Sequence, residues 1–176
     1  EVVAAFEEES GLDLVVRPSG DGGTLTNKLV LTKDDPTGDV AFGVDNTFAS
    51  RALEEGVFAP YAADAPAGVE AFALPGDDEG MLTPVDNGNV CVNVDDTWFA
   101  AEGIAPPQTL EDLTDPAYED LFVLPSAVTS TVGLAFLLAT IDEYGDEWPA
   151  YWTDLTANGA KLTAGWSDAY EVDFTQ

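Results

Sequence analysis

Two short segments in the last third of the chain combine residue types that bind small ligands. The first, residues 128–134, reads Val-Thr-Ser-Thr-Val-Gly-Leu and places three hydroxyl groups and a glycine before an apolar helical run. The first N–H groups of a helix have no partner within it. Ser130, Thr131 and the Gly133 backbone therefore predict a site for a phosphate, carboxylate or hydroxyl group. A second role stays open for Ser130 and Thr131, because either hydroxyl can cap the helix without touching a ligand.

The second segment, residues 161–170, reads Lys-Leu-Thr-Ala-Gly-Trp-Ser-Asp-Ala-Tyr and presents an indole on a glycine turn. Trp166 lies outside the aromatic stripe of residues 148–155, whose helical spacing predicts core packing. Tyr170 follows Trp166 by one helical turn. Aromatic faces presented from a loop bind flat or cationic ligands, so both rings are candidate ligand contacts, with structural packing the alternative for Trp166.

Asp45 and Asn46 form a third candidate group, directly after the apolar run of residues 39–44. That run predicts a strand buried on both faces, typical of the middle of a parallel sheet. Ligands of open α/β sheets bind at the carboxyl ends of the strands, which is where Asp45 and Asn46 fall. Capping the next helix is the alternative role for both side chains.

The elements that would position these residues alternate between strands and helices, which predicts an α/β fold with right-handed βαβ units. We expect helices ending near Gly11, over about 24–31, 47–55 and 132–144, and from about 109 and 147. We expect strands at 12–16, 39–44, 90–94 and 121–124, with parallel pairing for the first two and the last.

Charge narrows the range of partners. The 34 acidic and 5 basic residues give a formal net charge of −29, which excludes nucleic acid and argues against docking on an anionic membrane. A solvated acidic surface and adaptation to high salt both explain this acidity. The absence of histidine rules out histidine metal sites and Ser-His-Asp triads within this sequence.

Four landmarks, in this order, resemble the thiamine-binding proteins of bacterial ABC importers. They are the runs at 39–46, 83–88 and 106–113, and the pair Thr-Ser-Thr-x-Gly-Leu and Gly-Trp-Ser-x-Ala-Tyr. The resemblance implies a two-lobed periplasmic-binding-protein type II fold, incomplete here. Residues 1–87 would form a first lobe without its N-terminal strand, and residues 88–176 a second lobe without its C-terminal return segment.

The resemblance also implies a function. The protein would capture thiamine or a thiamine phosphate outside the cytoplasmic membrane and deliver it to an ABC permease, as a monomer with no enzymatic activity, cofactor or metal. Trp166 and Tyr170 would face the rings, Asp45 and Asn46 the amino and cationic parts, and Ser130, Thr131 and Gly133 the hydroxyethyl or phosphate arm. A periplasmic or extracellular location is implied, and a lipid anchor through the N-terminus stays open.

Two alternatives remain. One is a binding protein of this type for another small solute, such as ferric iron or an organic cation. The other is a thiaminase-like enzyme of the same fold that uses a cysteine nucleophile. Cys91 lies in the alternating run of residues 89–94, which predicts a thiol buried in a strand and poorly suited to become a thiolate.

Overall fold

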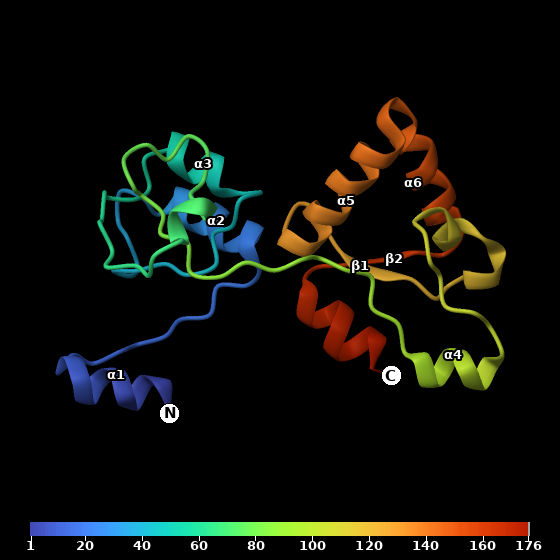
Figure 1. The fold of residues 1–176 in the computed structure, drawn as a ribbon, viewed down its shortest axis with the longest axis horizontal. Helices are drawn as coiled ribbons and strands as arrows, with labels where there is room; N and C mark the ends of the chain where they lie inside the picture. The colour runs from blue at the N-terminus through green and yellow to red at the C-terminus, as the bar shows by residue number, and fades with distance from the viewer. Residues whose placement is uncertain (176) are drawn as a thin grey trace.

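The computed structural model describes residues 1–175, and its elements form two groups with one helix standing apart (Figure 1). The helices and strands are α1 (Val2–Ser10), α2 (Gly22–Leu31), α3 (Ala49–Glu54), η1 (Val69–Phe72), α4 (Asp96–Glu102), η2 (Glu111–Thr114), η3 (Pro116–Tyr118), β1 (Val123–Pro125), α5 (Thr131–Tyr144), η4 (Gly145–Glu147), α6 (Trp148–Ala157), β2 (Lys161–Thr163) and the π-helix η5 (Asp168–Phe174).

The N-terminal group contains α2, α3 and η1, and the C-terminal group contains α4 to η5. An extended stretch of chain without regular structure, around residues 83–94, runs between them (Figure 1). Helix α1 lies away from both groups, and none of its residues is buried. No helix within residues 1–175 has the length and apolar character needed to cross a membrane.

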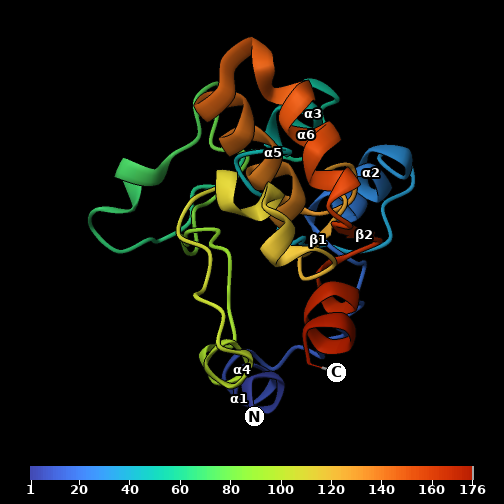
Figure 2. The ribbon, with the colours of Figure 1, turned by 90° about the vertical axis from the view of Figure 1, so that its right-hand side faces the viewer.

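A parallel pair of strands organises the C-terminal group. β1 pairs with β2 in the register Val123 with Lys161 and Pro125 with Thr163. Helices α5 and α6 lie on one side of the pair and η5 on the other, as two perpendicular views agree (Figures 1 and 2). The result is a helix–strand–helix layering of the α/β type. The hydrophobic core of this group contains Leu113, Leu124, Phe136, Tyr151 and Leu155.

The expected helices form close to their predicted bounds because their signals are local, whereas α4 and η5 were not predicted. Gly11 ends α1 in the left-handed conformation at φ 71°, which glycine adopts without steric cost. The predicted start near 109 is also confirmed: Thr109 N–H donates to Asp112 at 2.9 Å while Asp112 N–H donates to the Thr109 hydroxyl at 3.2 Å. This reciprocal pair is a capping box. In the stripe of residues 148–155, Tyr151 and Leu155 are buried as predicted.

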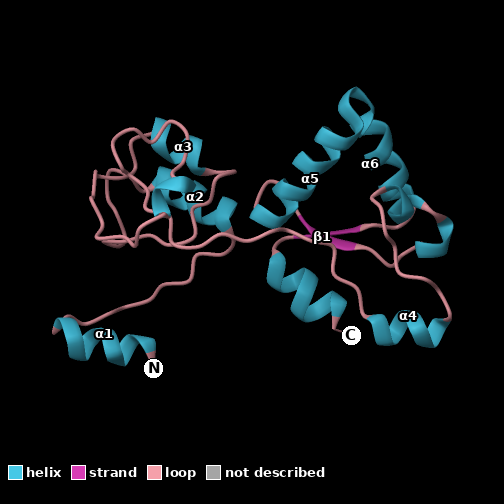
Figure 3. Ribbon diagram, in the orientation of Figure 1, coloured by secondary structure: helices cyan, strands magenta, loops and turns pink. Residues whose placement is uncertain are grey.

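Three of the four predicted strands are wrong in this structure. Residues 12–16, 39–44 and 90–94 carry no strand pairing, and only the last predicted strand forms, shifted to Val123–Pro125 (Figure 3). The apolar side chains of the unpaired runs are open to solvent; Val40 is 92% exposed. A strand exists only where a neighbour accepts and donates its backbone hydrogen bonds, and within residues 1–175 these runs have none.

The prediction that Cys91 is buried in a strand is also wrong, because its segment has no pairing partner. With the 90–94 run unpaired, the thiol is exposed rather than buried in a sheet. Together with Trp166 and Tyr170 it lines a pocket of about 260 Å³ beside β1. The argument that burial keeps this thiol unreactive therefore does not hold for this structure.

Candidate functional site

The two ligand-binding segments predicted from the sequence lie side by side at the carboxyl ends of the paired strands. β1 leads into the Ser/Thr loop before α5, and β2 leads into the Gly-Trp turn before η5. Two bonds hold these loops together: Ser126 N–H donates to the Thr163 carbonyl at 2.9 Å, and the Thr129 hydroxyl donates to the Ala164 carbonyl at 2.6 Å. Such a position is where open α/β sheets bind ligands.

Ser130 occupies the N-cap position of α5 but does not cap it. Its backbone is extended (φ −125°, ψ 135°), and its side chain makes no hydrogen bond to the helix. The residue is only 1% exposed. Since a capping serine normally bonds the N–H two or three residues on, the capping alternative is not realised for Ser130. The N–H groups of the first turn of α5 keep their capacity for an acceptor.

Gly133 has a packing role that its neighbours explain. A Cβ at this position would overlap the carbonyl oxygen of Pro125 and lie 2.6 Å from the Ser126 carbonyl carbon. Glycine therefore lets the first turn of α5 lie directly against the chain leaving β1. This close approach fixes where the N-terminus of α5 points.

Asp45, from the N-terminal group, contacts the N-terminus of α5. Its Oδ1 accepts hydrogen bonds from the backbone N–H of Thr47 at 2.6 Å and from the Thr47 hydroxyl at 2.5 Å. Its Oδ2 accepts a hydrogen bond from the Thr131 hydroxyl, 86 residues along the chain. Asp45 thus shapes the turn before α3 and also contacts the α5 N-terminus. Asn46, in contrast, is exposed and makes no side-chain contact that places it in the site.

Trp166 lies at the edge of this junction, 40% exposed. Its indole stacks on Tyr170 with ring centroids 4.7 Å apart and planes inclined by 19°. Tyr170 in turn stacks on Phe174 at 5.5 Å and 13°. Tyr170 thus stacks on two rings, yet it remains 41% exposed and lines the pocket beside β1. Both rings therefore remain candidate aromatic contacts for a ligand.

Sequence reasoning missed Asp21 and the two glycines that follow it. The Asp21 carboxylate accepts a hydrogen bond from the backbone N–H of Trp166 at 2.7 Å. Gly22 and Gly23 open α2, and a Cβ on either would overlap atoms of the Thr129–Thr131 region or of Asp45. The available signal was an acid followed by two glycines at the start of a helix.

The described geometry is that of an α/β protein with a candidate ligand site where two groups of elements meet, as in a solute-binding protein. The comparisons agree. The model of the bacterial extracellular solute-binding protein family matches residues 35–168. The chain belongs to this family.

Individual relatives are similar over nearly the whole chain. It is 31% identical over 166 residues to the thiamine-binding periplasmic protein of Brucella abortus, covering 94% of this chain and 47% of that protein. It is 30% identical over 170 residues to the Escherichia coli K12 protein of the same name, covering 96% and 50%. A solved structure named periplasmic thiamin binding protein superposes with a TM-score of 0.75 at 28% identity, covering 99% of this chain and 52% of that one.

The solved structure confirms the periplasmic-binding-protein fold expected from the sequence. The chain spans about half the length of the curated relatives it matches.

Proposed function

We propose that the protein captures thiamine or a thiamine phosphate and delivers it to an ABC permease. The observation that carries this proposal is the meeting of three chemistries at one junction. An acidic side chain (Asp45), a free helix N-terminus (Ser130, Thr131) and an exposed indole (Trp166) lie where the two groups touch. The names of the relatives, all thiamine-binding periplasmic proteins, point to the same ligand.

Each part of thiamine has a counterpart in this arrangement. The permanently cationic thiazolium suits the indole face of Trp166, a contact worth roughly 0.5–2 kcal/mol. A carboxylate such as Asp45 suits the amino and cationic parts. The hydroxyethyl or phosphate arm suits the N-terminus of α5, where the helix dipole places partial positive charge. Asn46 is proposed as a further polar contact, and Gly133 as a contact through its backbone.

The two groups of elements correspond, in this proposal, to two lobes at residues 1–87 and 88–176. Ligand binding would draw them together by a hinge motion, with no chemical step. We place the protein outside the cytoplasmic membrane as a monomer that engages its permease when loaded. The family description and the relatives' names support this location.

Calorimetric titration of the full-length protein tests the ligand. Thiamine, thiamine monophosphate and thiamine diphosphate are compared with choline, a cation that lacks the pyrimidine ring. We expect binding heat with at least one thiamine compound and none with choline. Absence of heat with every thiamine compound would refute the assignment.

An enzymatic function is tested in the same samples, because Cys91 is exposed and shares a pocket with Trp166. We propose that the protein does not consume its ligand. Thiamine is incubated with the protein and an aniline or thiol acceptor and then quantified by chromatography. Loss of thiamine that disappears in Cys91→Ser would overturn this part of the proposal.

A further inference from the structure

Asp21 occupies the N-cap position of α2 but does not cap that helix. An aspartate at an N-cap ordinarily accepts from the backbone N–H two or three residues on. The Asp21 side chain makes no such bond. Its carboxylate instead accepts the Trp166 backbone N–H at 2.7 Å, across 145 residues of chain. The contact joins the N-terminal group to the turn that carries the candidate ligand contact Trp166.

The chain around Asp21 is built for close approach to the C-terminal group. A Cβ on Gly22 would overlap the Thr131 hydroxyl and lie 2.8 Å from Asp45 Oδ2. A Cβ on Gly23 would lie 2.8 Å from the Val128 carbonyl oxygen and 2.9 Å from the Thr129 carbonyl carbon.

Next along the chain, Thr24 N–H donates to the Thr129 carbonyl at 3.1 Å. Four consecutive residues, 21–24, therefore contact or closely approach the other group.

A second carboxylate shows why Asp21 is unusual. Asp95 also occupies an N-cap position, at the start of α4, and it caps in the ordinary way. Its Oδ1 accepts from Thr97 N–H at 2.8 Å and Trp98 N–H at 3.1 Å. The same residue type in the same local position thus serves its own helix in one case and a distant turn in the other. Local capping accounts for Asp95 and does not account for Asp21.

We propose that Asp21 is a positioning residue that latches the two groups together. Its carboxylate holds the Trp166 turn against the N-terminus of α2, and Gly22 and Gly23 provide the space for that contact. The latch fixes the indole where it borders the junction and opposes separation of the groups. The part of this inference that concerns ligand release rests on the proposed function. The effect of Asp21 on the distance between the groups does not depend on the ligand.

The latch predicts a specific kinetic signature. Contacts that hold a closed state together act mainly on dissociation, whereas the first encounter depends little on them. Loss of the exposed, charge-assisted bond in Asp21→Ala should therefore speed thiamine dissociation by about threefold to thirtyfold, with the association rate changed by less than about twofold. Asp21→Asn retains an acceptor oxygen of the same shape and should recover most of the loss.

Stopped-flow fluorescence with thiamine on the full-length protein measures both rates. Asp95→Ala is the matched control, since it removes an N-cap carboxylate that contacts only its own helix, and its dissociation rate should equal that of the wild type. Gly22→Ala provides a second route, because the added Cβ would overlap the Thr131 hydroxyl and push α2 away from α5 while leaving the Asp21 carboxylate in place. It too should speed dissociation. Equal dissociation rates for Asp21→Ala and wild type would overturn the proposal.

A ligand-free measurement separates this inference from the ligand assignment. Spin labels at Asp35→Cys and Asp154→Cys, exposed positions in the two groups, report their separation in a Cys91→Ser background. Asp21→Ala should broaden the distance distribution toward longer values, and Asp95→Ala should not. If the wild type bound no thiamine compound, the proposed function would be refuted. The distance distribution would still show whether Asp21 holds the two groups together. An unchanged distribution in Asp21→Ala would refute it.

Discussion

Replacing Trp166 with alanine separates a ligand-facing indole from a structural one. Trp166 stands on the turn after β2, 40% exposed, with one ring face stacked on Tyr170. The backbone N–H of Trp166 donates a hydrogen bond to Asp21 of the other group. If the indole binds ligand, Trp166→Ala should weaken binding more than it weakens folding.

The expected magnitude follows from the exposed area. A tryptophan side chain offers about 250 Å² for burial, so an exposed fraction of 40% corresponds to about 100 Å² that a ligand can cover. At about 25 cal/mol per Å², full coverage contributes about 2.5 kcal/mol, and a cation over the ring adds roughly 0.5–2 kcal/mol. A ligand ring covers only part of this surface. We therefore expect a loss of about 1–3 kcal/mol, or about 5- to 150-fold in Kd.

The cost in stability should be smaller than for a core aromatic. Trp166→Ala removes the stack on Tyr170, worth about 0.5–1.5 kcal/mol, and some partly buried area. Core Trp→Ala substitutions typically cost about 3–5 kcal/mol.

Trp98 is a matched control, because it is also 40% exposed and packs on one aromatic neighbour, Phe99, at 5.1 Å. It lies on α4, away from the junction (Figure 1).

Thiamine titration and urea unfolding are measured on both variants. Trp98→Ala should lose a similar amount of stability and keep its affinity, whereas Trp166→Ala should lose affinity. The reasoning fails if Trp166→Ala binds like the wild type, or if it unfolds with the large loss of a core residue. In either case the exposed indole would be a packing residue of the π-helix and not part of the site.

Two further predictions concern stability. Gly133→Ala should lower the free energy of unfolding by about 1–3 kcal/mol, because its Cβ overlaps the backbone leaving β1; Gly88→Ala, whose Cβ would meet nothing within 4 Å, should be near neutral in the same urea titration, and equal losses would contradict the packing argument. The Gln108 and Thr109 N–H groups hold the pKa of Asp112 below its ordinary value. Its contribution to stability is therefore complete above about pH 4 and lost as the pH falls through the lower folded pKa. The stability gap between wild type and Asp112→Ala should narrow between pH 7 and pH 2, and a constant gap would refute this linkage.

The helices were predictable because the information that forms them is local. Periodicity, capping residues and terminal glycines lie within the segment itself, as the Gly11 end of α1 and the Thr109–Asp112 capping box illustrate. Strands carry no such complete signal. The apolar run of residues 39–44 has the composition of a buried strand, yet Val40 and Phe42 are exposed because no neighbouring strand pairs with them. Cys91 is exposed for the same reason, since no strand pairs with residues 90–94.

The candidate site shows the same division between local and distant information. The Ser/Thr loop was expected at the carboxyl end of a strand. The strand Lys161–Thr163, which brings the Gly-Trp turn beside that loop, was not predicted. The contact of Asp45 with Thr131 is not explained by that reasoning, because residues 39–44 form no strand. The contact of Asp21 with Trp166 is not readable from either segment alone, since an N-cap aspartate is fully explained by its own helix until the structure shows its carboxylate bonded elsewhere.

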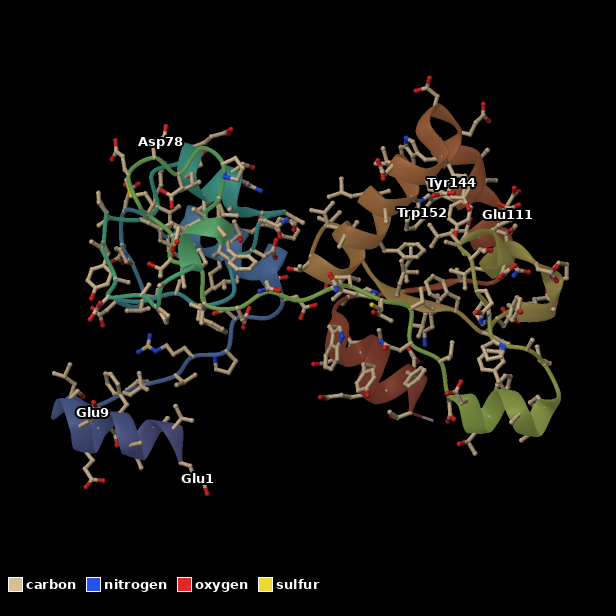
Figure 4. All side chains as sticks on the ribbon, in the orientation of Figure 1. Glu1, Glu9, Asp78, Glu111, Tyr144 and Trp152 are labelled. Carbon is tan, nitrogen blue, oxygen red and sulfur yellow. The ribbon has the colours of Figure 1, made fainter. Side chains whose placement is uncertain are left out.

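Most acidic side chains elsewhere on the protein do not bond from one group of elements to the other. The labelled residues Glu1, Glu9 and Asp78 lie on the outside of the ribbon, whereas Glu111 lies near the stacked Tyr144 (Figure 4). Glu111 accepts a long hydrogen bond from the Tyr144 hydroxyl, at 3.5 Å. Burial, with the Glu111 and Glu143 charges, raises the pKa of Tyr144. The formal charge of −29 thus belongs mostly to the solvated surface.

The two carboxylates at the junction differ from that surface because each is tied to the opposite group. Asp45 contacts Thr131 at the start of α5, and Asp21 contacts Trp166 at the start of η5. Both partners follow strands of the C-terminal group, while both carboxylates come from the N-terminal group. A site assembled this way is complete only when the groups are together, so affinity for the ligand and closure of the groups become one equilibrium. Any substitution that separates the groups should then weaken binding even where it touches no ligand.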